Sequence, residues 1–87
     1  MIEQALVVIP TYNEKDNITG ILNRILSLRN DIHVLILDDS SPDGTADLVK
    51  ALQSVYQGRL HLISRPGKMG LGTAYIHGFT WGLEQGY

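Results

Sequence analysis

Three short apolar runs, separated by segments with helical spacing, constrain what this 87-residue chain can fold into. The runs are Ala5–Ile9, Ile32–Leu37 and Leu60–Ile63, and the first stops at Pro10. Continuous apolar runs of about four to eight residues are typical of strands buried on both faces of a parallel sheet. The sequence therefore predicts three strands, of which the first two are buried.

The segments after these runs carry apolar residues at the spacing of one helix face. The first pattern runs from Ile18 to Leu26, and Asn13 is expected to cap its start. The second covers residues 48–56 and is expected to end at Gly58. The third is marked by four apolar residues: Tyr75, Ile76, Phe79 and Leu83. This order predicts an α/β fold, a Rossmann-like β-α-β-α-β-α half-domain with a parallel sheet and right-handed crossovers.

Composition and charge narrow the classes of protein to which the chain can belong. Hydrophobic residues make up 44% and charged residues 18%, which is typical of a folded globular domain. The net charge of -2, without a run of Lys or Arg, argues against nucleic acid as a partner. The absence of cysteine excludes disulfides and thiolate zinc sites and favours a cytoplasmic location. No apolar run approaches the roughly 20 residues that span a bilayer.

Two adjacent carboxylates, Asp38 and Asp39, follow the second apolar run directly, ahead of a turn at residues 41–44. Ligands of open α/β sheets bind beyond the carboxyl ends of the strands. A turn and a helix cap account for residues 43–45, whereas nothing local requires two like charges side by side. A calcium loop is excluded because Lys50 stands where that loop needs a glutamate. We therefore expect the two acids to form the rim of a ligand site.

The segment Pro10–Glu14 leaves the first strand at the same edge of a parallel sheet and brings an aromatic ring beside the two acids. Tyr12 can cover a base, and carboxylates accept hydrogen bonds from ring N–H groups or ribose hydroxyls. The alternative is that Asn13 and Glu14 merely begin a helix.

The glycine-rich segment Gly70–Tyr75 begins like a dinucleotide-binding fingerprint, but Tyr75 replaces the third glycine and the segment follows the third strand. A Walker loop is also excluded, because Met69 follows Lys68. Two interpretations stay open. The segment is a cationic loop in which Arg65 and Lys68 meet phosphate, or it is a structural turn into the third helix.

The histidines and the C-terminal aromatic residues indicate no catalytic or metal site. His33, His61 and His77 are scattered over two predicted strands and a helix, without metal-ligand spacing. Trp81 and Tyr87 are expected to pack or to lie at an edge. We therefore predict structural roles for all five residues.

Three segments, Val8–Glu14, Leu37–Thr45 and Gly70–Gly78, together resemble the dolichol-phosphate (polyprenol-phosphate) mannosyltransferase family. These proteins are inverting glycosyltransferases of the GT-A type, and the resemblance covers nearly the whole chain in the right order. It implies that residues 1–87 form the N-terminal, nucleotide-sugar-binding part of a GT-A domain, with the metal and acceptor half missing.

The resemblance also implies roles for individual residues. The nucleotide-sugar pocket would be lined by Pro10, Tyr12, Glu14, Leu37 and Asp39. Supporting positions near the donor would be Asp38, Lys68, Gly70 and Gly72. No catalytic residue and no metal ligand is expected within the chain, because the family's metal-binding Asp-x-Asp motif would lie beyond Tyr87.

The implied reaction transfers mannose from GDP-mannose to the phosphate of a dolichyl or polyprenyl acceptor at the cytoplasmic face of a membrane. A divalent cation, Mg or Mn, is expected to hold the charge that develops on the leaving diphosphate. Because the motif that would bind it is missing, we expect the isolated 87 residues to be inactive.

Two alternatives to this function stay open: a related polyprenyl-phosphate glycosyltransferase that uses a UDP-sugar, and a non-catalytic nucleotide-binding module. In either case the resemblance implies that the first strand has an unpaired edge. An apolar edge invites association, so self-association through this strand is expected.

Overall fold

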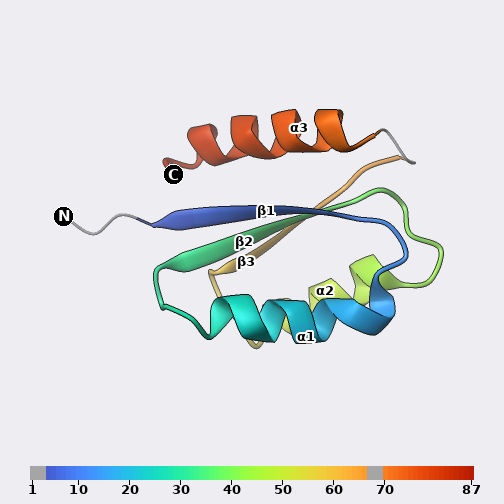
Figure 1. Cartoon of the computed structure of the whole chain (residues 1–87), viewed down its shortest axis with the longest axis horizontal. Coiled ribbons are helices and arrows are strands. Elements are labelled where there is room, and N and C mark those ends of the chain that lie inside the picture. Colours follow the sequence, from blue (N-terminus) through green and yellow to red (C-terminus); the bar gives the residue numbers. More distant parts are fainter. Residues whose placement is uncertain (1–3, 67–69) are drawn as a thin grey trace.

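Strands and helices alternate along the chain in the computed structural model, which describes residues 4–66 and 70–87. The elements are β1 (Ala5–Thr11), α1 (Lys15–Leu26), β2 (Ile32–Asp38), α2 (Thr45–Gln53), β3 (Leu60–Ser64) and α3 (Leu71–Glu84). The strands form one parallel sheet in the order β1-β2-β3. Helices α1 and α2 cover one face of this sheet and α3 covers the other (Figure 1). The predicted α/β order is confirmed.

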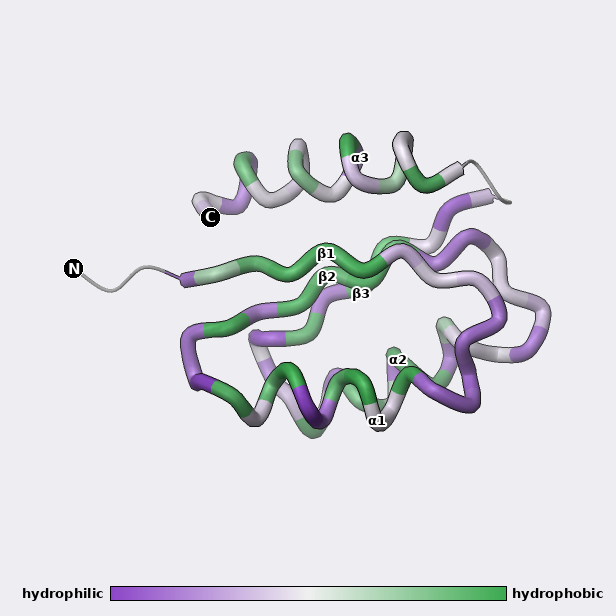
Figure 2. The backbone as a smooth tube through the Cα atoms, viewed as in Figure 1, coloured by the Kyte–Doolittle hydropathy of each residue, from purple (hydrophilic) through white to green (hydrophobic). Residues whose placement is uncertain are grey.

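The register of the sheet brings the carboxyl ends of the strands to one edge. Thr11, the last residue of β1, pairs with Asp38, the last residue of β2. Asp38 in turn pairs with Ser64, the last residue of β3. The loops that follow the strands therefore begin side by side, and polar segments gather there (Figure 2).

The main hydrophobic core lies between the sheet and the helices α1 and α2. Because side chains alternate along a strand, Val34 and Ile36 of β2 point to this face. They pack with Ile18 and Leu22 of α1 and with Val49 of α2, and all five are fully buried. The central strand is buried on both faces. The prediction that the first strand is buried on both faces is wrong: β1 lies at the edge of the sheet and is mostly half-buried.

Helix α3 packs through small residues. Its buried positions are Ala74, Gly78 and Gly82, and a Cβ atom placed on Gly78 would lie 2.5 Å from Val8 Cγ1. The large apolar residues that predicted this helix lie on its other side: Tyr75, Ile76, Phe79 and Leu83, which are 41–76% exposed. The helix is confirmed, but its packing face is not the one that large apolar side chains indicate.

Two predicted helix ends are wrong. Asn13 does not cap α1, because the cap position is Glu14 and Asn13 has a positive φ of 56°. Helix α2 ends at Gln53, and Gly58 lies in the following turn with a φ of 77°. In both places the chain turns in the left-handed region, which Gly adopts freely and Asn tolerates.

Strand β1 pairs with β2 alone within the described part of the chain. β1 is thus an edge strand there, and self-association through its outer edge stays a prediction. A hollow of about 360 Å³ lies beside this edge and is lined by Leu6, Val8, Phe79 and Leu83 among others. No helix in residues 4–66 and 70–87 is long and apolar enough to cross a membrane.

Four aromatic side chains form a cluster at the amino end of the strands: His33 of β2, His61 of β3, Trp81 of α3 and Tyr87, which follows α3. The Tyr87 hydroxyl is hydrogen-bonded to His33 Nδ1 and lies 3.2 Å from His61 Nε2. Trp81 packs on His61 and Tyr87, with ring centroids 5.0 and 6.1 Å apart. The structural roles predicted for these residues fit this packing, but the two histidines are neighbours rather than scattered. Because paired strands bring them together, their sequence positions do not reveal the contact.

Stability should decrease when the cluster is acidified. Burial lowers the pKa of both His33 and His61, helped by the charge of Arg59 near His33 and opposed there by Asp31. The unfolded chain therefore binds protons first as pH falls below about 6.5. We expect the urea midpoint of unfolding to be lower at pH 5.5 than at pH 7.5. This change of the midpoint with pH should be much smaller in the variant His33→Gln/His61→Gln. The variant His77→Gln removes an exposed imidazole outside the cluster. It should keep the change of the urea midpoint with pH that His33 and His61 produce.

Candidate functional site

The loop after β2 caps the start of α1. The N–H groups of Asn13, Glu14 and Lys15 donate to side-chain oxygens of Ser41, Thr45 and Asp43, at 2.8, 3.1 and 3.1 Å respectively. The N–H groups of Glu14 and Lys15 are among those that a helix start leaves without intrahelical partners. The bonds tie the loop after β1 to the loop after β2, so the polar segments at the sheet edge have a defined relative position.

Asp43 connects two helix starts. Besides Lys15, its carboxylate accepts from the Thr45 N–H at 3.0 Å and from the Thr45 hydroxyl. The hydrogen bond from the Thr45 side chain is the main reason that the pKa of Asp43 is lowered. The predicted turn and cap around Asp43 are confirmed, and the contact with α1 adds a role that the local pattern does not show.

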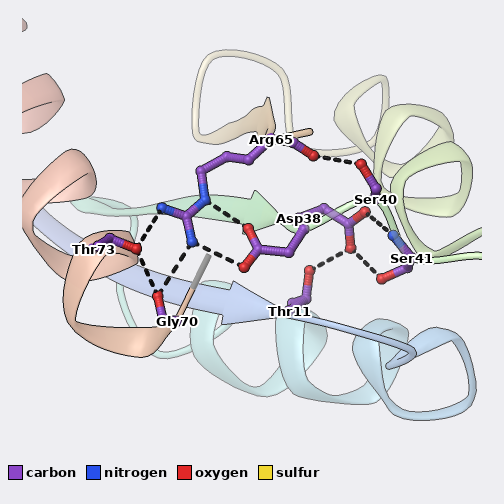
Figure 3. Close-up of polar contacts among 8 residues, drawn as sticks. Thr11, Asp38, Ser40, Ser41, Arg65, Gly70 and Thr73 are labelled. Carbon is purple, nitrogen blue, oxygen red and sulfur yellow. Dashed lines mark hydrogen bonds and ion pairs between the residues drawn. The ribbon is translucent and has the colours of Figure 1, made fainter. Parts of the chain in front are cut away.

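Asp38 and Asp39 are adjacent in sequence but have different surroundings. Asp38 is fully buried, and its Oδ1 accepts from the hydroxyls of Thr11 at 2.7 Å and Ser41 at 2.6 Å. Its Oδ2 accepts from the Ser41 N–H at 3.0 Å (Figure 3). Asp38 therefore holds the end of β1 and the start of the next loop together.

Asp39 is paired with Arg65, the residue that follows β3. Arg65 Nε donates to Asp39 Oδ1 at 2.6 Å and a terminal nitrogen donates to Oδ2 at 2.9 Å. The same guanidinium donates to Thr73 Oγ1 at 3.2 Å and to the Gly70 carbonyl at 3.3 Å, at the start of α3. The hydrogen bond and the charge of Asp39 raise the pKa of Arg65 against the effect of burial. In one of the two interpretations of this segment Arg65 meets phosphate, whereas in this structure it is engaged with an acid.

A cavity of about 250 Å³ lies at the carboxyl ends of β1 and β2, beside Asp39. Its walls come from three parts of the chain: Pro10, Thr11, Tyr12 and Glu14 after β1, Asp39 after β2, and Gly70 and Leu71 at the start of α3. An aromatic ring and two carboxylates thus face one opening. Aromatic rings pack on planar groups, and carboxylates accept hydrogen bonds from N–H and O–H groups.

The structure brings together four of the five residues that the sequence assigns to a nucleotide pocket: Pro10, Tyr12, Glu14 and Asp39. Leu37 is fully buried and lies beneath α3, where it would touch a Cβ atom on Gly78. Among the supporting residues, Gly70 borders the cavity, whereas Asp38 is buried and is not among the residues that line it. Gly72 lies in the first turn of α3, and Lys68 lies outside the described residues. The ligand roles of all of these residues stay predictions.

The carboxylates at this edge do not fit a metal site. Asp38 and Asp43 already accept several hydrogen bonds, and Asp39 is bound by both arms of the Arg65 fork. Within residues 4–66 and 70–87, no three His, Asp or Glu side chains are grouped to hold a cation. A divalent ion that takes several oxygen ligands would have to displace these donors.

A model of the glycosyl transferase family 2 matches residues 6–83. The chain belongs to this family. Among family-2 relatives, a polyprenol monophosphomannose synthase of Mycolicibacterium smegmatis is 45% identical over 85 residues, covering 98% of this chain and 32% of the relative. An undecaprenyl-phosphate mannosyltransferase of Micrococcus luteus is 43% identical over 84 residues, covering 97% of this chain and 34% of the relative. The chain thus spans about a third of the length of these relatives.

A solved structure shows the same fold as this family-2 chain. It is a mannosyltransferase from Pyrobaculum calidifontis, determined in complex with GDP-Man and Mn2+. The two superpose with a TM-score of 0.76 at 24% identity, over 100% of this chain and 25% of that one. The predicted GT-A half-domain fold is confirmed.

Proposed function

We propose that the chain forms the donor-nucleotide half of a polyprenyl-phosphate mannosyltransferase that uses GDP-mannose. The cavity lined by Pro10, Tyr12, Glu14 and Asp39 is the observation that carries this proposal. The names of the two relatives support a polyprenyl-phosphate acceptor, and the GDP-Man in the structural neighbour supports the donor. Because the acceptor is a membrane lipid, transfer would take place at the cytoplasmic face of a membrane.

The surroundings of the cavity suit a guanine nucleotide. Guanine presents a ring N–H and an exocyclic NH₂ as donors, and carboxylate oxygens accept hydrogen bonds from such groups. In this proposal Asp39 accepts a hydrogen bond from the base, Tyr12 covers the base, and Glu14 accepts from ribose hydroxyls; their position around one cavity supports these roles. Leu37 forms part of the packed floor beneath α3. In this proposal the chain binds and orients the donor.

The chemistry needs little acid–base help from this half. The acceptor phosphate is already an anion and attacks the anomeric carbon from the face opposite the leaving GDP, so the configuration inverts. A divalent cation, Mg or Mn, would balance the charge on the leaving diphosphate. Its ligands would have to be residues other than Asp38, Asp39 and Asp43, which are engaged with protein donors.

The proposal predicts that Tyr12→Ala weakens donor binding. Losing the ring over the base should raise the Kd for GDP about tenfold or more, because base–aromatic stacking contributes about 1–3 kcal/mol. Calorimetric titration of the full gene product with GDP, GDP-mannose and UDP-glucose measures this effect. Leu28→Ala, an exposed apolar residue in the turn after α1, is the matched control and should leave the Kd unchanged.

Transfer assays with a polyprenyl phosphate and either nucleotide sugar complete the test. Mannosyl transfer from GDP-mannose supports the proposal. Transfer from UDP-glucose with no use of GDP-mannose would replace it with the related UDP-sugar enzyme. Nucleotide binding without any transfer would indicate a binding module, and absence of GDP binding would overturn the assigned pocket.

A further inference from the structure

Ser41 connects the loop after β1 to the buried carboxylate of Asp38. The Asn13 N–H donates to Ser41 Oγ at 2.8 Å, and the Ser41 hydroxyl donates to Asp38 Oδ1 at 2.6 Å. Because an ionised carboxylate only accepts hydrogen bonds, the Ser41 proton is directed to Asp38 and a lone pair of Ser41 Oγ is turned to Asn13. Asn13 has a positive φ of 56°, which is uncommon outside glycine, so this hydrogen bond stabilises a turn that the chain would otherwise adopt rarely.

Thr45 makes the same kind of link at the next residue of that loop. The Glu14 N–H donates to Thr45 Oγ1 at 3.1 Å, and the Thr45 hydroxyl donates to Asp43 Oδ1. Thr45 is fully buried, and the other oxygen of Asp43 accepts from the Lys15 N–H at 3.1 Å. The hydrogen bond from the Thr45 side chain lowers the pKa of Asp43, so this carboxylate is ionised at neutral pH and acts as an acceptor only.

These two hydroxyl links hold the segment that forms one wall of the donor cavity. The segment contributes four residues to that wall: Pro10, Thr11, Tyr12 and Glu14. Ser41, Asp43 and Thr45 are not among the described residues that line the cavity. Any effect of these three side chains on a bound donor therefore passes through the backbone of the loop after β1.

We propose that Ser41, Asp43 and Thr45 are positioning residues for the donor site: they hold the loop after β1 in the backbone conformation that brings Tyr12 and Glu14 to the cavity. The inference rests on the proposed function. Without the hydroxyl links the loop would sample other conformations, and the Kd would rise by the inverse of the fraction that is competent to bind. Positioning of this kind changes the affinity for the donor even in molecules that are fully folded.

The decisive experiment compares Thr45→Val with Thr45→Ser by calorimetric titration of the full gene product with GDP. Valine keeps the shape of threonine without its hydroxyl, whereas serine keeps the hydroxyl without the buried methyl group. We expect Thr45→Val to raise the Kd for GDP about tenfold, as when about a tenth of the molecules keep the competent loop, and Thr45→Ser to stay within about twofold of the wild type. A role in packing alone predicts the reverse order, because the methyl group is then what matters. Weaker binding by Thr45→Ser than by Thr45→Val, or wild-type affinity in Thr45→Val, would overturn the inference.

Asp43→Asn serves where Thr45→Val does not fold. The amide keeps the shape of the acid, but its NH₂ group replaces one acceptor and must face an N–H or O–H donor. We expect the Kd for GDP to rise about threefold or more, since part of the population then loses the competent loop. Asp47→Asn is the matched control: it removes the same charge from an exposed acid in the first turn of α2 and should leave the Kd unchanged. Equal Kd values in the two variants would overturn the role of Asp43.

Val49→Ala controls for a general loss of stability. Val49 is fully buried in the core beneath α2 and is not among the described residues that line the cavity. At a temperature at which all variants are folded by circular dichroism, Val49→Ala should bind GDP like the wild type although its urea midpoint is lower. Affinities that simply follow the urea midpoints of all variants would indicate general loosening and overturn the inference. Absence of GDP binding by the wild type would instead overturn the proposed function, so the two failures are distinguishable.

Discussion

Replacing Asp38 by alanine is expected to lower the free energy of unfolding by about 3–4 kcal/mol, because three hydrogen bonds to a buried carboxylate are lost together. The Ser41 N–H and the Thr11 hydroxyl would remain near a small cavity without their acceptor. Small domains have a stability of about 5–15 kcal/mol, so this is a large part of the total. Urea unfolding followed by far-UV circular dichroism measures the loss.

Two further variants separate the hydrogen bonds from the charge. Asp38→Asn keeps the shape and one oxygen, but its NH₂ group must face a donor, so we expect a loss between wild type and alanine. Asp47→Ala removes an exposed acid in the first turn of α2 and should cost only a few tenths of a kcal/mol. Equal effects of Asp38→Ala and Asp47→Ala would contradict the structural role of Asp38.

The order of elements and the position of the site could be predicted from the sequence because both follow from local patterns. Apolar runs specify strands, and parallel strands place their carboxyl ends at one edge. Asp39 and Tyr12 could therefore be assigned to one opening before the fold was known. The division between Asp38 and Asp39 could not be predicted, because it depends on Thr11 and Arg65, which are distant in sequence.

The contact between Arg65 and Asp39 is one that local sequence patterns do not predict. The place of Arg65 after β3 and the pairing of β3 with β2 bring this residue to the edge where Asp39 lies. A sheet order of β1-β2-β3 was therefore the signal that could have predicted the pair. The basic charge of Arg65 in a glycine-rich loop pointed instead to phosphate, since composition alone does not show that the guanidinium is buried.

The packing face of α3 was missed for a different reason. Periodicity of large apolar residues shows that a helix is amphipathic, but it does not show how closely the helix approaches a sheet. Here the approach is close enough that only small residues fit, and Gly78 lies against Val8 and Leu37. Glycine in a helix lowers its intrinsic stability, so these positions are evidence for contact rather than for propensity.

Replacing Gly78 by alanine is therefore expected to destabilise the protein by about 1–3 kcal/mol, although alanine is the better helix former. The added Cβ would lie 2.5 Å from Val8 Cγ1 and 3.2 Å from Leu37 Cδ1. Val8 is β-branched and held in a strand, so it has little freedom to move aside. The helix must shift outward and lose contact with β1. We expect this loss to lower the urea midpoint of unfolding.

Alanine substitutions at two other glycines should change stability differently: one should stabilise the protein, and the other should destabilise it less than Gly78→Ala does. Gly20, on the exposed side of α1, has nothing within 4 Å of the position that a Cβ atom would take, so Gly20→Ala should stabilise the protein by about 0.5–1 kcal/mol. A Cβ on Gly82 would lie 2.8 Å from Leu6 Cδ2, the end of a flexible side chain, so Gly82→Ala should cost less than Gly78→Ala. Stabilisation by all three substitutions would show that α3 does not press on β1, since helix propensity alone would then determine the response.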